Sequence, residues 1–204
     1  MDVSRIFDAL NDPQREAVGA PPGPMLVLAG AGSGKTRVLT YRIAYLVQAL
    51  EVSPYSILAV TFTNKAANEM RKRIEGFLGF SVRGMWIGTF HGLSHRILRD
   101  HHELAGLPKG FEILDSDDQY RVIRRALKEL NLDEGYWPPR QIQWFINSQK
   151  EEGRRATQVQ DNGDSHQQTL IRVYTHYEET CQRLGLVDFA ELLLRTLELL
   201  EQTS

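Results

Sequence analysis

The sequence predicts an α/β protein in which a parallel sheet with crossover helices is followed by a helical region. Over roughly the first ninety residues, short apolar runs alternate with amphipathic stretches at a spacing of about thirty residues, which is typical of strand-helix units. After about residue 113, apolar residues recur only at helical spacing. We therefore expect residues 1–100 to form the α/β part and residues 101–204 to form a helical subdomain.

Each strand-helix unit begins with an apolar run bounded by Gly, Pro or Ser. Strands are expected at residues 25–29, 57–61 and 85–88. Helices are expected at residues 35–48, 64–77 and from about 89 to 100. Before these units, Asp12 is expected to cap a short helix that has Pro13 at its first position. Because parallel strands end at one edge of a sheet, the segments that follow the three strands should lie on the same side.

The second half contains helix-start signals and one loop. Ser116 with Gln119, and Asp188 with Glu191, have the spacing of capping boxes. The expected helices are Tyr120 to Leu130, Pro139 to about Gln149, Gln167 to Leu184, and Phe189 to Leu200. The Gly-, Asp-, Gln- and Arg-rich segment from Glu151 to Ser165 is interpreted as a mobile loop.

Composition indicates a soluble, cytoplasmic protein with no membrane partner. No apolar run approaches the roughly 18 residues of a membrane span, and the N-terminus lacks the pattern of a signal peptide. The single cysteine, Cys181, excludes an internal disulfide framework and a cysteine-based zinc site. The net charge is −2, yet residues 1–100 carry 12 Lys and Arg against 8 Asp and Glu, while residues 101–204 carry 12 against 18. Any site for a polyanion is therefore expected in the first half.

A glycine-rich loop follows the first apolar run and precedes a helix. Its glycines allow the backbone N–H groups to approach phosphates, to which the helix presents its positive end. Lys35 then supplies a cation for the β- and γ-phosphates, and the Thr36 hydroxyl is placed to bind Mg²⁺. The pattern indicates a site for a magnesium nucleoside triphosphate, with ATP as the expected cofactor; the alternative is a structural Gly-rich turn with an incidental lysine. The loop residues are Ala29, Gly30, Ala31, Gly32, Ser33, Gly34, Lys35 and Thr36.

Two further strand ends carry hydroxyls, an amide and an aromatic ring next to a helix start. This combination suits single-stranded nucleic acid, because hydroxyls and N–H groups hold phosphates and rings stack on bases. Positive charge lies nearby at Lys65, Arg71, Lys72, Arg73 and Arg96. In the alternative interpretation, the rings belong to the core and the polar side chains only cap helices. The residues concerned are Phe62, Thr63, Asn64, Thr89, Phe90 and His91.

Taken in order and spacing, the motifs closely resemble the N-terminal third of the UvrD/Rep/PcrA family of superfamily 1 DNA helicases. The resemblance covers essentially the whole chain, and the alanine at the first loop position is the form that this family uses. The motifs that carry it are Leu10 to Gln14, Ala29 to Thr36, Thr61 to Ala67, Gly88 to His91, and Leu186 to Leu193.

The resemblance implies a P-loop ATPase domain with a partial RecA-like parallel sheet and an inserted helical subdomain. Both would belong to an ATP-dependent motor that moves 3′ to 5′ along single-stranded DNA, meets duplex junctions, and acts in DNA repair and replication. It further implies that Gln14 reads the adenine and that Arg37 lies near it. Lys35 and Thr36 would hold phosphate and Mg²⁺, and the six strand-end residues would contact DNA.

The family's Asp-Glu pair on an apolar strand, and the arginine of its second RecA-like domain, are not found in these 204 residues. We therefore expect an N-terminal fragment that is inactive by itself, and the resemblance implies that its full-length parent is an ATP hydrolase and helicase. Two other classes stay open: a small P-loop kinase, and a module that binds nucleotide or single-stranded DNA without catalysis. The kinase would need an arginine-rich lid, which the sequence does not clearly offer.

Overall fold

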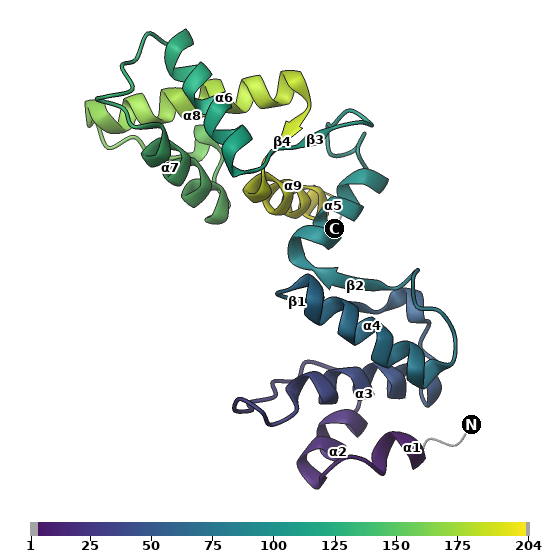
Figure 1. The fold of residues 1–204 in the computed structure, drawn as a ribbon. Coiled ribbons are helices and arrows are strands. Elements are labelled where there is room, and N and C mark those ends of the chain that lie inside the picture. The colour runs from purple at the N-terminus through teal and green to yellow at the C-terminus, as the bar shows by residue number, and fades with distance from the viewer. Residues whose placement is uncertain (1–3, 203–204) are drawn as a thin grey trace. The chain divides into compact units, whose positions relative to one another are not determined.

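The structure, a computed structural model, describes residues 4–202, and they divide into two compact units (Figure 1). One unit extends to Leu93 and the other begins at Ser94, so the boundary falls inside helix α5 (Phe90–Asp100). Within the described part, no helix combines the length and apolarity needed to cross a membrane.

The first unit contains a two-stranded parallel sheet and the helices around it. Strand β1 pairs with β2 in a register that runs from Leu58 opposite Trp86 to Thr61 opposite Thr89. The parallel arrangement predicted for these two strands is confirmed. The elements are α1 (Ser4–Phe7), α2 (Asp12–Gly19), α3 (Lys35–Gln48), the 3-10 turn η1 (Pro54–Ser56), β1 (Leu58–Thr61), α4 (Asn64–Leu78) and β2 (Trp86–Thr89).

Helix α4 covers the sheet, and α3 packs against α4 (Figure 1). The buried face of α4 places Met70 and Ile74 against Ile87 of β2, and Ile43 of α3 joins the same cluster. Met70 and Ile74 are four residues apart, which puts them on one face of the helix. This packing fixes the positions from which the segments after β1 and β2 begin.

The expected strand at residues 25–29 is wrong. Residues 24–30 have no secondary structure, and Leu26 and Leu28 are 81% and 85% exposed. An extended apolar segment becomes a strand only when a neighbouring strand satisfies its N–H and C=O groups. Within residues 4–202, the sheet of β1 and β2 has two strands and does not include this segment.

The cap of α2 is also corrected. Asn11, not Asp12, is the N-cap, and its side-chain oxygen accepts the N–H of Gln14 at 3.0 Å. The Gln14 side-chain oxygen accepts the N–H of Asn11 at 3.2 Å, which completes a capping box. Asn and Asp cap helices about equally well, so composition alone did not distinguish the two positions.

The second unit is mainly helical, but it contains a short strand pair that the sequence did not predict. Strands β3 and β4 pair in parallel through Glu112 with Leu186 and Ile113 with Val187, so the expectation of helices alone after residue 113 is wrong. As expected, no strand from the described residues of this half joins the sheet of β1 and β2. The elements are β3 (Glu112–Ile113), α6 (Ser116–Glu129), α7 (Pro139–Glu151), the 3-10 turn η2 (Ala156–Gln158), α8 (Ser165–Leu184), β4 (Leu186–Val187) and α9 (Phe189–Gln202).

Two other expectations for this unit are corrected. Asp115 caps α6 in place of Ser116, because its carboxylate accepts the N–H groups of Asp117 and Asp118 at 2.9 and 2.8 Å. The segment interpreted as a mobile loop contains η2 and is anchored by Arg155, whose guanidinium bonds to carboxylates on other elements. Short-range sequence patterns carry no information on such long-range anchors.

Candidate functional site

The phosphate-loop sequence forms a turn that leads directly into the N-terminus of α3. Gly32 and Gly34 have φ angles of 75° and 87°, in the left-handed region where glycine is favoured. The Ser33 hydroxyl donates to the Gly30 carbonyl at 2.7 Å and holds the turn closed. Helix α3 begins at Lys35, so its first unpaired N–H groups and the positive end of its dipole lie at the loop.

Gln14 lies against this loop, although nineteen residues separate it from Ser33 in the sequence. Its amide nitrogen donates to the Ser33 carbonyl at 3.1 Å, while the capping box holds its oxygen. A Cβ at Gly34 would lie 2.9 Å from the Gln14 amide nitrogen, so a larger residue there would displace the Gln14 side chain. The resemblance alone suggested that Gln14 belongs with the loop, and the structure brings the two together.

The Lys35 ammonium folds back over the loop. It donates to the carbonyls of Ala29 and Gly30 at 2.9 and 2.6 Å. Both acceptors are neutral, so an anionic phosphate oxygen would be a stronger partner for the ammonium. The loop therefore combines a cation, glycine backbone and a helix N-terminus, which is the donor set that a phosphate chain requires.

Arg37 and Thr36 extend the site along α3. The Arg37 guanidinium lies 5.6 Å from the centre of the Tyr41 ring, and the Tyr41 ring packs edge-on against Phe77 with centres 4.4 Å apart. Arg37, Tyr41, Arg73, Gly76 and Phe77 line a hollow of about 620 Å³. Thr36 is exposed in the first turn.

Sequence reasoning missed Tyr41 and Phe77. Their only signal was a four-residue spacing from Arg37 and Arg73, respectively. Thr36 offers one hydroxyl for a metal ion, and in the described part of the chain no group of three or more His, Cys, Asp or Glu side chains is arranged to hold one.

The two strand ends lie side by side because of the sheet register. Thr61 and Thr89 form the last pair of β1 and β2, so Phe62 and Phe90 follow at adjacent positions. Their ring centres are 6.2 Å apart, and the rings are 90% and 52% exposed. Among the described residues, these rings therefore lie on the surface and not in the core.

The hydroxyls beside the rings cap helices. Thr63 accepts the N–H of Ala66 at 3.1 Å at the start of α4, and Thr89 accepts the N–H of Gly92 at 3.1 Å in the first turn of α5. Asn64 and His91 occupy the first turns of α4 and α5 and are exposed. The surface thus presents two rings beside two helix N-termini.

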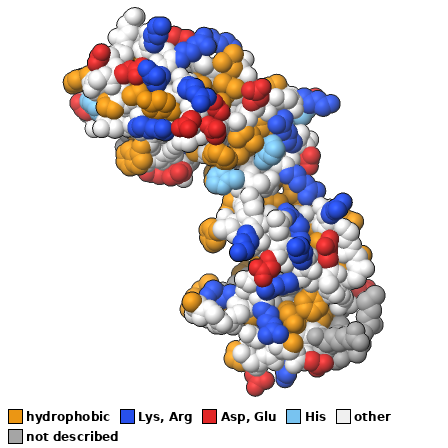
Figure 2. Space-filling model, viewed as in Figure 1, with side chains coloured by type: hydrophobic (Ala, Val, Ile, Leu, Met, Phe, Trp, Pro, Cys, Tyr) orange, Lys and Arg blue, Asp and Glu red, His pale blue; other side chains and the backbone are white. Residues whose placement is uncertain are grey.

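Two of the nearby arginine side chains already have partners within the chain. Arg71 donates to the Asn68 side chain at 2.7 Å and to the Ile87 carbonyl, and Arg73 forms an ion pair with Glu69. On the face drawn in Figure 2, Lys and Arg side chains lie along the first unit with acidic side chains among them, and both kinds are also interspersed on the second unit. The exposed aromatic pair is therefore a more distinctive feature of this surface than its charge.

Comparison with known proteins agrees with this geometry. Residues 10–204 match the family described as the UvrD/REP helicase N-terminal domain. The chain belongs to this UvrD/REP helicase family. It is 62% identical to DNA helicase II of Salmonella typhimurium and of Escherichia coli K12, over 199 residues that cover 98% of the chain and 28% of each relative. It is 45% identical to the ATP-dependent DNA helicase PcrA of Leuconostoc citreum over 205 residues, 98% of the chain and 27% of that protein. The chain thus spans less than a third of the length of these relatives.

The second unit of this UvrD/REP chain contains a buried ionic network that the sequence did not reveal. The Lys150 ammonium, on a side chain 2% exposed, lies 2.7 Å from an Asp188 oxygen and 2.9 Å from a Glu191 oxygen. The Tyr177 hydroxyl donates to Asp188 at 2.7 Å, and Asp188 also accepts the N–H of Glu191 at 2.7 Å. Asp188 and Glu191 had been interpreted as a capping box: the cap by Asp188 is present, but the Glu191 carboxylate bonds to cations of the network.

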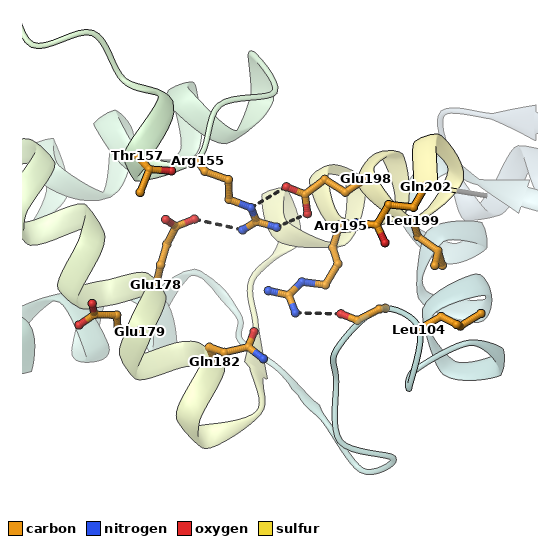
Figure 3. A pocket seen from close by; sticks show the side chains of 11 residues that line it. Leu104, Arg155, Thr157, Glu178, Glu179, Gln182, Arg195, Glu198, Leu199 and Gln202 are labelled. Atoms are coloured by element: carbon orange, nitrogen blue, oxygen red, sulfur yellow. Dashed lines mark hydrogen bonds and ion pairs between the residues drawn. The ribbon is translucent and has the colours of Figure 1, made fainter. Parts of the chain in front are cut away.

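Arginine side chains close this network on its outer side. Arg155 lies between Glu178 and Glu198, at 3.0 and 2.6 Å, in a pocket of about 460 Å³ (Figure 3). Arg195 in the same pocket donates to the Ala105 carbonyl at 3.1 Å and pairs with Glu191 at 2.7 Å. Lys150 and Arg155 are thus paired within the unit.

Burial and the surrounding charges perturb ionisation in this network. Burial disfavours the Glu191 carboxylate, but Lys150 and Arg155 outweigh it and hold the pKa of Glu191 far below its usual range. Burial raises the pKa of the Cys181 thiol to about 12, which disfavours the reactive thiolate. The network ties α7, α8, α9 and the segment before η2 together.

Proposed function

We propose that this chain forms the ATP- and single-stranded-DNA-contacting part of an ATP-dependent 3′ to 5′ DNA helicase. The observation that carries the proposal is the juxtaposition of Gln14, the glycine loop and Lys35 at the N-terminus of α3. Family membership supports it, and the names of the relatives, DNA helicase II and ATP-dependent DNA helicase PcrA, give the activity. The cellular role proposed is DNA repair and replication in the cytoplasm.

In the proposed nucleotide site, the loop N–H groups and Lys35 hold the phosphates of ATP. Lys35 exchanges the carbonyls of Ala29 and Gly30 for phosphate oxygens and becomes a charge-assisted donor. Thr36 supplies one oxygen to Mg²⁺, which would neutralise charge on the phosphates. Gln14 and Arg37 border the position of the adenine, and the hollow beside Arg37 and Tyr41 gives the base an aromatic neighbour.

In the proposed DNA site, Phe62 and Phe90 stack on bases at a strand that meets a duplex junction. Base stacking on an aromatic ring contributes about 1–3 kcal/mol and is tolerant of sequence. Thr63, Asn64 and the α4 N-terminus offer donors to phosphate on one side of the rings. Thr89, His91 and the start of α5 offer them on the other. The exposure of both rings supports this role.

We further propose that residues 1–100 are the first part of a RecA-like ATPase domain, called 1A, and that residues 101–204 are the inserted helical subdomain, 1B. The separation of the described residues into an α/β unit and a mainly helical unit supports this assignment.

The residues of the proposed nucleotide site are not a complete set of catalytic groups. Phosphoryl transfer requires charge neutralisation on both sides of the transferred group, and an arginine finger alone contributes about a thousand-fold or more. On the phosphate side, this chain offers the loop amides, Lys35 and Thr36. We expect nucleotide binding without turnover at the rate of a motor.

Titration of a fluorescent ATP analogue with Mg²⁺, followed by an ATPase assay with and without oligo-dT, tests this function. Lys35→Ala should weaken nucleotide binding about tenfold or more, because it removes the ammonium that folds over the loop. Lys72→Ala, at an exposed position on α4, is the matched control and should leave binding unchanged.

Failure of the chain to bind the analogue at millimolar concentration would contradict the nucleotide site. Turnover that is stimulated by oligo-dT and lost in Lys35→Ala would show instead that the 204 residues are catalytically sufficient.

A further inference from the structure

An apolar groove of about 400 Å³ lies on the helical unit and takes no part in the proposed nucleotide or DNA sites. It is formed where the segment before α7, the first turns of α7, and the start of α8 come together. Trp137 is 9% exposed and stacks on His166, with ring centres 4.6 Å apart and planes at 26°. Tyr136 and Trp144, which also line the groove, are 73% and 72% exposed.

The groove is preformed. The Asp133 carboxylate accepts the N–H groups of Gly135 and Tyr136 at 2.9 and 3.2 Å and so fixes the turn that presents the Tyr136 ring. Trp144 follows Ile142, which is 1% exposed and belongs to the core of the unit. A rigid apolar pocket binds with little ordering cost, and Trp and Tyr are the residue types that contribute most to protein interfaces.

The lip of the groove is acidic. Asp133 adjoins Tyr136, and Asp164 adjoins His166, where it caps α8 through the N–H groups of His166 and Gln167, both at 3.3 Å. Arg140 is the cation that lines the groove, and Asp117 neutralises it at 3.1 Å. Two carboxylates therefore adjoin residues that line the groove, and Arg140 already has an acidic partner.

We propose that this groove docks a basic segment of a partner protein. An apolar, aromatic or proline side chain of that segment would pack between Tyr136 and Trp144. A neighbouring lysine or arginine would face Asp133 and Asp164. Aromatic-lined grooves bind extended peptides in this manner, and charged residues at the rim favour peptides of the opposite charge.

The net charge of the helical unit favours a basic peptide over nucleic acid as the occupant of the groove. From Ser94 to Ser204 the chain carries 14 Lys and Arg against 19 Asp and Glu. A polyanion is repelled by such a surface, whereas a basic peptide is attracted. The aromatic rings of the groove thus differ in setting from Phe62 and Phe90, which lie in the unit that carries the basic excess.

Selection from a displayed library of random 12-residue peptides, against the 204-residue chain, tests the proposal. The enriched peptides should combine Lys or Arg with Pro, Leu or an aromatic residue. Their affinity, measured by fluorescence anisotropy, should fall about tenfold or more in Trp144→Ala. Leu104→Ala is the matched control, because Leu104 is 65% exposed in the same unit and lies outside the groove.

Two isosteric variants test the charge component without disturbing the fold. Asp133→Asn removes the negative charge and keeps the one oxygen that accepts both backbone N–H groups. Asp164→Asn also removes the charge, and it keeps one of the two accepting oxygens, which suffices for a helix cap. Each should weaken binding of the basic peptides about two- to fivefold at low salt, and less at high salt. Equal affinity for the wild type and for both variants would refute the role of the lip.

Several results of these experiments would overturn the proposal. Enrichment of acidic peptides, failure to enrich any peptide, or unchanged affinity in Trp144→Ala would each do so. Oligo-dT that binds the wild type and loses affinity in Trp144→Ala, but not in Phe62→Ala, would assign the groove to nucleic acid. A dimer seen by sedimentation velocity and abolished by Trp144→Ala would assign it to a second copy of the chain.

Discussion

Replacement of Lys150 by methionine tests whether the buried ionic network stabilises the helical unit. The substitution keeps the length and apolar stem of the side chain but removes the charge that lies between Asp188 and Glu191. Glu191 retains Arg155 and Arg195 as partners, at 2.7 Å each. Asp188 loses the one cation paired with it in the described structure.

Removal of one partner from a buried pair costs about 3–5 kcal/mol, since the remaining charge is desolvated and uncompensated. Asp188 keeps hydrogen bonds from the Tyr177 hydroxyl and from the N–H of Glu191, both at 2.7 Å, so we expect the lower end, about 3 kcal/mol. For a unit of roughly one hundred residues, each kcal/mol lowers the melting temperature by about 4–8 °C. The expected shift for Lys150→Met therefore exceeds about 10 °C.

Urea denaturation followed by circular dichroism at 222 nm measures this loss. Addition of Asp188→Asn to Lys150→Met should restore about 1–2 kcal/mol, because it removes the unpaired charge and keeps the acceptor for the Glu191 N–H. Lys128→Met, at an exposed position near the end of α6, is the control and should change stability by less than about 0.5 kcal/mol. A loss below about 1 kcal/mol for Lys150→Met, or a double variant less stable than the single one, would refute the reasoning.

Three further predictions concern the loop, the aromatic pair and pH. Gly34→Ala should destabilise the loop by about 1–3 kcal/mol and weaken binding of the ATP analogue. The φ of 87° is unfavourable for alanine, and the added Cβ would meet the Gln14 side chain. Unchanged binding in a fluorescence titration would contradict this prediction. Phe62→Ala should weaken oligo-dT binding about five- to hundredfold without changing nucleotide affinity. Tyr55→Ala, at another exposed ring of the same unit, is the control and should change neither affinity. Fluorescence anisotropy measures the oligo-dT and nucleotide affinities of each variant. Because the pKa of Glu191 is depressed in the folded chain, its carboxylate stabilises the fold above about pH 4.3, and this contribution is lost as the pH falls further. Between pH 6 and pH 3, the urea midpoint should therefore fall less steeply in Glu191→Gln than in the wild type. Equal slopes for the two proteins would count against this prediction.

The sequence by itself determined the local features of this protein. The glycine loop predicted the turn into α3, whose start at Lys35 and end at Gln48 agree with expectation. The parallel pairing of the second and third apolar runs followed from their spacing as strand-helix units. These features depend on short-range periodicity, glycine conformation and capping, which are encoded within a few consecutive residues.

The tertiary structure decided what depends on partners distant in the chain. The apolar run at residues 25–29 is not a strand among the described residues, because strand formation requires hydrogen bonds to a neighbour that local sequence does not specify. Lys150 and Asp188 are 38 residues apart, and only folding brings them to 2.7 Å. The sequence allowed Phe62 and Phe90 to be either core or surface, and the register of β1 and β2 placed both rings together on the surface. Burial and long-range pairing are properties of the packed chain, so they became visible only with the fold.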